Sequence, residues 1–581
     1  MSKRASRSKN RGTVLRQQSS TDALREKGSG NANTSATMNG VILEHRRRHA
    51  SFDSNSPASQ AASLMGNTSF SLDDEVPELG EGEEGLSKGF LELSKKDQSN
   101  FLLLVLLYFL QGIPMGLAHG SVPFLLKNNV SYSAIGVFSL AAYPYSLKLF
   151  WSPIVDALWS PSVGRRKSWI LPIQTISGFS MIWLGRNINR MMTEAGETDS
   201  GVWNFTMWWF ALVFLCATQD IAVDGWALTL LSNENLAYAS TAQTVGLTAG
   251  QFLSYTVFLA FNSKDFANQW FRSVPGETGI MELDSYLTFW GWAYLVVTLG
   301  LAVMKREDRD RNGDGISEVY RTMWGILKLK NIQSFIIIHL IAKIGFQAND
   351  AVTSLKLLDK GLKQEQLSLV ILVDFPVEVF LGYYIGKWCQ TYPPMHIWCW
   401  SFVGRLVAAG FAQFVVSIFP AGGAGSGFLL LVIAEHVLST FMNTVMFVAV
   451  SAFHAKISDP VIGGTYMTLL ATVSNLGGTF PRYFVLKAVD MFTSATCVPP
   501  TNPPKAELLK GPLVTQPFSC ALEQERHRCR DGGGMCNITT DGYYIVNILC
   551  IVVGVLTFWG YIKPAVRRIQ ALPLRAWRLA G

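Results

Sequence analysis

Apolar segments of about 20 residues recur along the chain from Phe101 onward, and this repetition limits the fold more than any other feature. A helix of that length crosses the roughly 30 Å hydrocarbon core of a bilayer. Only 16% of the 581 residues are charged, whereas charged residues make up about a quarter of a soluble domain. The chain is therefore predicted to be a polytopic membrane protein built only of α-helices.

The apolar segments also predict the division of the chain. We expect a disordered cytosolic tail over 1–97, a six-helix bundle over 98–304, a cytosolic linker over 305–332, a second six-helix bundle over 333–561 and a basic cytosolic tail over 562–581. The twelve membrane helices are expected near 101–118, 134–152, 168–185, 205–224, 237–260, 286–304, 333–351, 366–385, 397–419, 428–448, 464–488 and 542–561.

Basic residues predict the orientation of these helices. They concentrate between Lys305 and Lys330, between the second and third helices, and after the last helix. Because loops rich in Lys and Arg stay in the cytosol, both termini are expected there. The net charge of +7 lies in tails and loops without any nucleic-acid motif, so nucleic acid is excluded as a partner. Ser51 follows three arginines, a spacing that suits a basophilic kinase and a solvated charge run equally well.

The segment between the last two helices, residues 489–541, is expected on the face opposite the cytosol. It contains four cysteines, an even number that predicts two disulfides in one of three pairings. Three glycosylation sequons are expected in loops on the same face. The cysteines are Cys497, Cys520, Cys529 and Cys536, and the sequons begin at Asn129, Asn204 and Asn537.

Ionisable side chains inside the predicted helices are candidates for function, because each costs at least about 2.5 kcal/mol at the centre of a bilayer. Lys148 lies in the second helix. Asp220 and Asp224 share one face of the fourth, and Lys343, Gln347 and Asp350 share one face of the seventh. Further charged residues, expected near helix ends, are Arg405, Glu435, His436 and Arg482.

Two interpretations of these residues remain open. In the first, they line a cavity in which Lys and Arg bind an anionic solute and the acids supply counter-charge or coupling. In the second, they pair between helices without touching a solute, for example Lys148 with Asp220 or Asp224. For Lys148 and Lys343 we favour the cavity. The two interpretations are evenly balanced for the aspartates, and for Arg405, Glu435 and Arg482 we favour pairing.

A short basic turn follows the second helix. Asp156 comes first, and then Gly164, Arg165 and Arg166 precede the third helix. A carboxylate facing a basic turn can form a latch at the cytosolic face, and Asp459 near the eleventh helix is expected beside it. This pattern resembles a motif of the major facilitator superfamily, whose twelve helices form two six-helix halves around a solute site.

Longer strings resemble the acetyl-coenzyme A transporter family, and related features occur in bacterial muropeptide permeases. The resemblance covers residues 95–561 and rests on SLKLFWSPIVDA at 146–157, GRRKSW at 164–169, ATQDIAVDGWALTLL at 217–231, AKIGFQANDAVTSLKL at 342–357 and SDPVIGGTYMTLLATVSNLGG at 458–478.

The resemblance implies transport of acetyl-CoA from cytosol to endoplasmic reticulum lumen, in exchange for CoA, by alternating access. Lumenal acetyltransferases would then be indirect partners, and the cysteine segment would be lumenal. Such a carrier is not an enzyme, and it needs no cofactor or metal. The resemblance leaves open whether two copies form a homodimer. Phosphates attract cations and adenine stacks on aromatic rings, so the expected contacts are Lys148, Lys343, Arg405, Arg482, Tyr143, Tyr145, Trp151, Gln111, Gln219, Gln243, Gln347 and Asn475.

Three alternatives remain beside this one. The same fold could carry another organic anion, such as oxidised glutathione or a muropeptide-like solute, by exchange or with protons through Asp220 or Asp224. His436 could serve as the base of a membrane acyltransferase. A receptor without transport is the third alternative, and it predicts no solute flux.

Overall fold

The structure is a computed structural model that describes part of the chain. It covers residues 93–577 except 128, 233–234, 236, 306, 308–315, 374–384, 386–387, 389–390, 421, 458–462 and 501–510. The chain divides into two units after Asp53, and all of the described residues belong to the second. The predicted tail up to residue 92, with Ser51, lies outside the described residues, as does Asp459.

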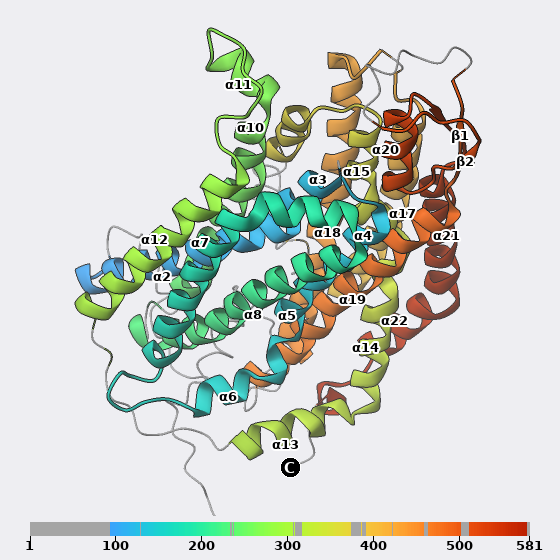
Figure 1. Cartoon of the computed structure of the whole chain (residues 1–581). Coiled ribbons are helices and arrows are strands. Elements are labelled where there is room, and N and C mark those ends of the chain that lie inside the picture. The colour runs from blue at the N-terminus through green and yellow to red at the C-terminus, as the bar shows by residue number, and fades with distance from the viewer. Residues whose placement is uncertain are drawn as a thin grey trace, which may run out of the picture. The chain divides into compact units, whose positions relative to one another are not determined.

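We call the helices up to α12 the N-terminal half (Figure 1). They are α2 (Lys95–Gly116), η2 (Leu117–Ser121), α3 (Val122–Lys127), α4 (Tyr132–Ser139), η3 (Leu140–Ala142), α5 (Tyr143–Leu147), η4 (Lys148–Phe150), α6 (Ser152–Ala157), α7 (Lys167–Glu197), α8 (Asp199–Leu230), α9 (Ala237–Phe252), η6 (Leu253–Val257), α10 (Phe258–Asn262), α11 (Lys264–Trp270) and α12 (Leu283–Met304).

The elements from α14 onward form the C-terminal half, which α13 (Ile316–Leu327) precedes. They are α14 (Lys330–Ala342), η7 (Lys343–Phe346), η8 (Asn349–Thr353), α15 (Ser354–Asp359), a short helix Gln364–Val373, α17 (Pro394–Ser417), α18 (Ser426–Ile457), α19 (Gly463–Phe492), β1 (Ser494–Val498), β2 (Phe518–Ser519), α20 (Glu523–Asp531), β3 (Met535–Thr540), α21 (Gly542–Thr557), η10 (Phe558–Ile562), α22 (Lys563–Gln570) and η11 (Leu574–Trp577).

Among the described residues, seven helices are long and apolar enough to cross a bilayer. An eighth is reached if α13 and the helix Lys330–Phe346, which meet at 80°, count as one span. The expected number of twelve therefore stays a prediction. The first helix begins at Lys95 rather than Phe101, because the Ser94 hydroxyl accepts a hydrogen bond from the Asp97 amide and caps it. The boundary predicted at residue 97 was thus too late.

Glycines bring the helices of the N-terminal half into close contact. A Cβ on Gly112 of α2 would lie 2.5 Å from the Leu247 carbonyl oxygen and 2.8 Å from the Gly250 Cα of α9. Such distances leave no room for a side chain, so the two helices pack backbone against backbone. This packing fixes α2, which carries Tyr108 and Gln111, against its neighbours.

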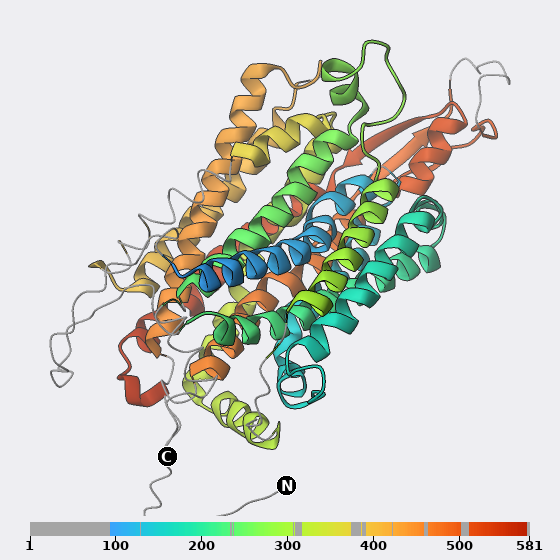
Figure 2. The same cartoon turned by 90° about the vertical axis from the view of Figure 1, so that its left-hand side faces the viewer.

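The second unit has two distinct ends (Figures 1 and 2). We call the end with β1, β2, α20 and α11 the disulfide end, and the opposite end with α6 and α13 the linker end. At the disulfide end, the strands form an antiparallel sheet in the order β2-β1-β3, in which Cys497 lies opposite Cys536. The disulfides join Cys497 to Cys529 and Cys520 to Cys536, which is one of the three pairings that the sequence allows.

Candidate functional site

A first polar cluster lies between the second and fourth membrane helices. Lys148 of η4 forms an ion pair with Asp220 of α8 and a longer one, 3.6 Å, with Asp224 one turn further along. The side chain of Asp220 is fully buried, whereas that of Lys148 is 18% exposed. The structure therefore contains the pairing that the sequence left as an alternative to a free Lys148.

Hydrogen bonds from two other helices complete this cluster. The Tyr108 hydroxyl and the Gln243 amide donate to Asp224 Oδ1 at 2.7 Å and 2.8 Å. With its amide oriented to satisfy both atoms, Gln111 donates to Asp220 Oδ1 at 3.1 Å and accepts from the Asp220 backbone amide at 3.2 Å. Tyr108 was not predicted, although it lies three residues before Gln111 and so shares its helix face.

Aromatic side chains of the broken second helix flank the cluster. The Lys148 ammonium lies 5.1 Å from the centre of the Tyr145 ring, and the Trp151 indole donates to the Thr218 hydroxyl at 3.2 Å. Tyr143 instead reaches the other half, where its hydroxyl donates to the Phe480 carbonyl oxygen at 3.3 Å. Of the three rings, Tyr145 therefore borders the paired lysine, Trp151 contacts α8 and Tyr143 contacts α19.

A second polar cluster lies in the C-terminal half. Arg405 of α17 forms an ion pair with Asp350 of η8 and donates to the Ser439 carbonyl oxygen at 2.9 Å. Asn349 donates to the Ser439 hydroxyl at 3.1 Å and to Glu435 at 3.4 Å. The predicted placement of charges near helix ends was wrong for Arg405 and Glu435, which are buried in the middle of α17 and α18.

The seventh membrane helix is not the regular α-helix assumed for its polar stripe. Residues 343–346 form a 3₁₀ turn and residues 349–353 a π turn, so the spacing of Lys343, Gln347 and Asp350 does not define one face. Asp350 faces Arg405, whereas the Lys343 ammonium donates to the Ser474 carbonyl oxygen at 3.2 Å. Lys343 also lies across Gly478, where a Cβ would come within 3.2 Å of its nitrogen.

Arg482 lies in the middle of α19, and this again differs from the helix end that we expected. Its guanidinium interacts electrostatically with His119 and Tyr255 of the N-terminal half and with Asp350 of its own half. Within the part of the chain that the structure describes, Arg482 and Lys343 make no ion pair, and Arg482 Nε has no hydrogen-bond partner. Both cations interact electrostatically with Asp350, but without a direct ion pair, because that carboxylate is paired with Arg405.

Three other predicted contacts lie apart from these pairs. Gln219 is buried in α8 but makes no hydrogen bond to Lys148, Asp220 or Asp224. Gln347 is buried, and its side-chain oxygen has no partner among the described residues. Asn475 is exposed on α19.

The turn after the second helix is held by a residue that the sequence did not suggest. Glu307, which follows α12, accepts hydrogen bonds from the backbone amides of Arg166 and Lys167 at 2.9 Å and so caps α7. Gly164 has a φ of 113°, and a Cβ there would lie 2.5 Å from Glu307 Oε2. No spacing in the sequence links Glu307 to this turn.

The proposed latch itself is only partly within the described residues. The Arg166 guanidinium packs against Gly225 of α8, where a Cβ would overlap it. Arg165 also takes part in a hydrogen bond or another non-covalent interaction, so it is not without a partner. The side chain of Asp156 and all of Asp459 lie outside the described residues, so the latch stays a prediction.

The halves meet directly at the disulfide end. Asp359 of α15 forms an ion pair with Lys127 of α3 at 2.9 Å and accepts a hydrogen bond from the Tyr132 hydroxyl at 2.7 Å. Lys363 forms an ion pair with Asp265 of α11, also at 2.9 Å. These contacts hold the two halves together at this end.

The sequons differ in their surroundings. Asn129 lies in an exposed turn after α3, and Asn537 is exposed in β3. The expectation that Asn204 lies in a loop was wrong, because α8 begins five residues earlier, at Asp199. The Thr206 hydroxyl of that sequon is buried and donates to the Val202 carbonyl oxygen.

Known proteins resemble this chain in sequence and in fold. The model of a family described as "Acetyl-coenzyme A transporter 1" matches residues 100–312, 308–396 and 391–579. The chain is similar to the uncharacterized membrane protein YBR220C of Saccharomyces cerevisiae, with 41% identity over 84% of this chain and 98% of that protein. It is also 28% identical to the anhydromuropeptide permease of Escherichia coli over 29% of this chain and 32% of the permease.

Solved structures agree on the fold. The nucleoside transporter NupG aligns over 80% of this chain and 99% of its own, with a TM-score of 0.54 and 13% identity. At that identity the likeness concerns the fold alone. It is the fold of the major facilitator superfamily, so the chain is a multi-pass membrane protein of that architecture.

Proposed function

Because the chain belongs to the acetyl-coenzyme A transporter family, we propose that it carries acetyl-CoA from the cytosol into the lumen of the endoplasmic reticulum in exchange for CoA. The solute crosses unchanged, so the protein acts as a transporter and not as an enzyme. The acetyl-CoA delivered in this way supplies lumenal acetyltransferases. The relative from Escherichia coli is named a permease, which agrees with transport.

One observation carries this proposal, namely two interior cations that form no direct ion pair with a described residue. Lys343 and Arg482 make no ion pair with a described residue, although Lys148 and Arg405 do. An unpaired charge inside a membrane protein is costly unless it has a polar partner. Lys343 has a neutral polar partner, the Ser474 carbonyl oxygen, but neither cation has a directly paired anion among the described residues. We assign that role to the phosphates of acetyl-CoA, which accept strong hydrogen bonds from Lys and Arg.

The position of Arg482 suits a solute bound between the halves. It belongs to α19 but interacts with His119 and Tyr255 of the N-terminal half. Tyr143, from the second helix, also reaches α19. A solute held at this boundary contacts both halves at once, as alternating access by two bundles over 98–304 and 333–561 requires.

The two ends support the orientation that this proposal needs. Basic residues concentrate in the linker, in the turn at Arg165 and Arg166, and after the last helix, which supports a cytosolic linker end and cytosolic termini. The disulfide end then faces the lumen, where disulfides form. Opening toward the lumen requires the pairs of Asp359 with Lys127 and of Lys363 with Asp265 to separate.

The test is the uptake kinetics of labelled acetyl-CoA by purified protein in liposomes. Loss of one charged hydrogen bond costs about 1.5–3 kcal/mol, so we expect Arg482→Gln and Lys343→Gln to raise KM roughly 10- to 100-fold. The control is Lys487→Gln, since Lys487 is exposed on the same helix as Arg482 and lies 6.0 Å from the Tyr483 ring. An unchanged KM in both interior variants would contradict the assignment of these cations.

Competition separates the alternative solutes. Unlabelled CoA should suppress uptake more strongly than oxidised glutathione or a muropeptide. Stronger suppression by either of those two would indicate that the same site binds a different organic anion. Proton coupling through Asp220 or Asp224 predicts uptake that follows an imposed pH gradient, whereas exchange predicts uptake that follows internal CoA.

A further inference from the structure

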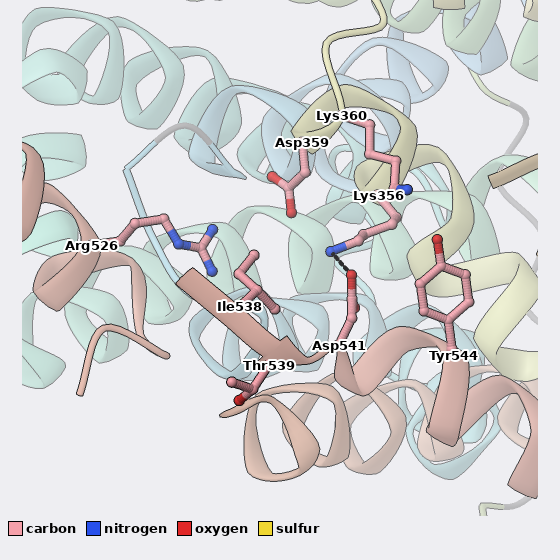
Figure 3. A pocket seen from close by; sticks show the side chains of 8 residues that line it. All are labelled: Lys356, Asp359, Lys360, Arg526, Ile538, Thr539, Asp541 and Tyr544. Atoms are coloured by element: carbon pink, nitrogen blue, oxygen red, sulfur yellow. Dashed lines mark ion pairs between the residues drawn. The ribbon is translucent and has the colours of Figure 1, made fainter. Parts of the chain in front are cut away.

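A separate cavity lies at the disulfide end, away from the two interior clusters. It has a volume of about 480 Å³ and lies where α15, the disulfide-linked segment and α21 meet (Figure 3). This volume is in the range of sites that bind small molecules. The lining residues are Lys356, Asp359, Lys360, Arg526, Ile538, Thr539, Asp541 and Tyr544.

Cations outnumber acids in this cavity, three to two. Both carboxylates already have partners, because Asp541 forms an ion pair with Lys356 at 2.6 Å and Asp359 forms one with Lys127 at 2.9 Å. Lys127 does not line the cavity. It belongs to the N-terminal half and neutralises the charge of Asp359. Lys360 makes no ion pair with any described residue, and its ammonium lies 5.7 Å from the centre of the Tyr544 ring.

The side chains converge on the same space. Figure 3 shows the Arg526 guanidinium directed toward the cavity from α20, opposite Lys356 and Asp541. The Lys356 and Asp541 side chains are only 10% and 18% exposed, so their charges are partly removed from water and interact more strongly than surface charges. Tyr544 adds an aromatic ring beside Lys360. Cations beside an aromatic ring suit a phosphate attached to a ring system.

We propose that this cavity is a second, separate binding site that takes an organic phosphate through Lys360, Lys356 and Arg526, with Tyr544 beside the organic group. A bound phosphate competes with Asp541 for Lys356. The site is distinct from the interior cations of the proposed function, and binding to it does not depend on that function. If the disulfide end faces the lumen, the site receives anions from that side.

The cavity is also placed to affect the contact between the halves. Asp359 lines it and at the same time pairs with Lys127 and Tyr132 of the N-terminal half. Lys356 is in the same short helix, α15, as Asp359. An anion that draws Lys356 away from Asp541 therefore acts on the helix that carries this contact.

The experiment measures binding of adenosine 3′,5′-bisphosphate and, separately, of inorganic phosphate to the purified full chain by calorimetry. Arg482→Gln serves as the background, because it weakens the interior site while leaving the cavity unchanged. In that background we expect Lys360→Gln to weaken binding of the bisphosphate about tenfold or more. Lys264→Gln is the control, since Lys264 is also at the disulfide end but pairs with Glu277, and its side chain is 59% exposed.

A second variant keeps the test decisive if Lys360→Gln folds poorly. Asp541→Asn removes the carboxylate that competes for Lys356, and asparagine can still cap α21 as Asp541 does. We therefore expect this variant to bind the bisphosphate several-fold more tightly. Equal binding by Lys360→Gln and Lys264→Gln, or weaker binding by Asp541→Asn, would overturn the proposal. Equal affinity for inorganic phosphate and the bisphosphate would overturn the assignment of an organic phosphate.

If the bisphosphate binds only through the interior site, Arg482→Gln weakens binding roughly 10- to 100-fold and Lys360→Gln has no further effect, so the cavity proposal fails while the proposed function stands. If binding survives Arg482→Gln and is lost with Lys360→Gln, the cavity is a site whatever the transported solute. The two proposals therefore fail under different results.

Discussion

The ion pair between Lys148 and Asp220 makes a quantitative prediction about stability. The Asp220 side chain is fully buried and Lys148 is 18% exposed, so removal of the lysine leaves a buried carboxylate without its cation. Such a loss costs about 3–5 kcal/mol in the free energy of unfolding. We expect Lys148→Met to be destabilised by this amount, and Lys148→Met combined with Asp220→Asn to be more stable than Lys148→Met alone.

A double-mutant cycle of these substitutions measures the interaction energy between Lys148 and Asp220. We expect a coupling energy of about 2–3 kcal/mol between Lys148 and Asp220, measured by equilibrium unfolding in mixed micelles. Asp224 is the matched control, because it lies 3.6 Å from Lys148 and its side chain is 40% exposed. Its coupling to Lys148 should be at most about 1 kcal/mol. Additive effects of Lys148→Met and Asp220→Asn, within about 0.5 kcal/mol, would refute a structural role for this pair.

The other predictions concern the turn before α7 and the disulfide end. Gly164→Ala should lower the free energy of unfolding by about 1–3 kcal/mol, since Gly164 has a positive φ and Glu307 lies against it; a thermal unfolding midpoint equal to wild type would contradict this. Glu307→Gln removes a charged cap and should cost about 0.5–1 kcal/mol in the same assay. Peptide mapping without reduction should recover the two disulfides seen here and no other pairing. If the disulfide end is lumenal, Asn537→Gln should remove a glycan and shift the protein on a gel, whereas Asn204→Gln, within a helix, should not.

The sequence was sufficient for the membrane fold and for the charged residues of the first cluster, but not for Tyr108. The length of a membrane helix is set by the bilayer thickness, so apolar segments of that length predict membrane helices. Asp220 and Asp224 lie one turn apart on a regular helix, α8. The pairing with Lys148 could be named as an alternative, because all three residues belong to one half. Whether Lys148 is paired could not be decided, since that depends on how two helices pack.

The contacts of the second cluster could not be predicted from residue spacing. The stripe from Lys343 to Asp350 assumed a regular α-helix, but 3₁₀ and π turns separate these residues. Arg405 and Asp350, which form an ion pair, are 55 residues apart in the sequence. Local residue spacing does not predict such a contact. The electrostatic interaction of Arg482 with His119 of the opposite half was missed for the same reason. Long-range contacts of this kind depend on the tertiary fold and not on periodicity.

The most direct test of the account is counterflow. Purified protein in liposomes, preloaded with CoA or left empty, is given acetyl-CoA labelled in its adenine half. We expect uptake that depends on internal CoA, with a KM that Arg482→Gln raises and Lys487→Gln leaves unchanged. Absence of uptake under every loading, from protein shown to be folded, would contradict acetyl-CoA as the solute.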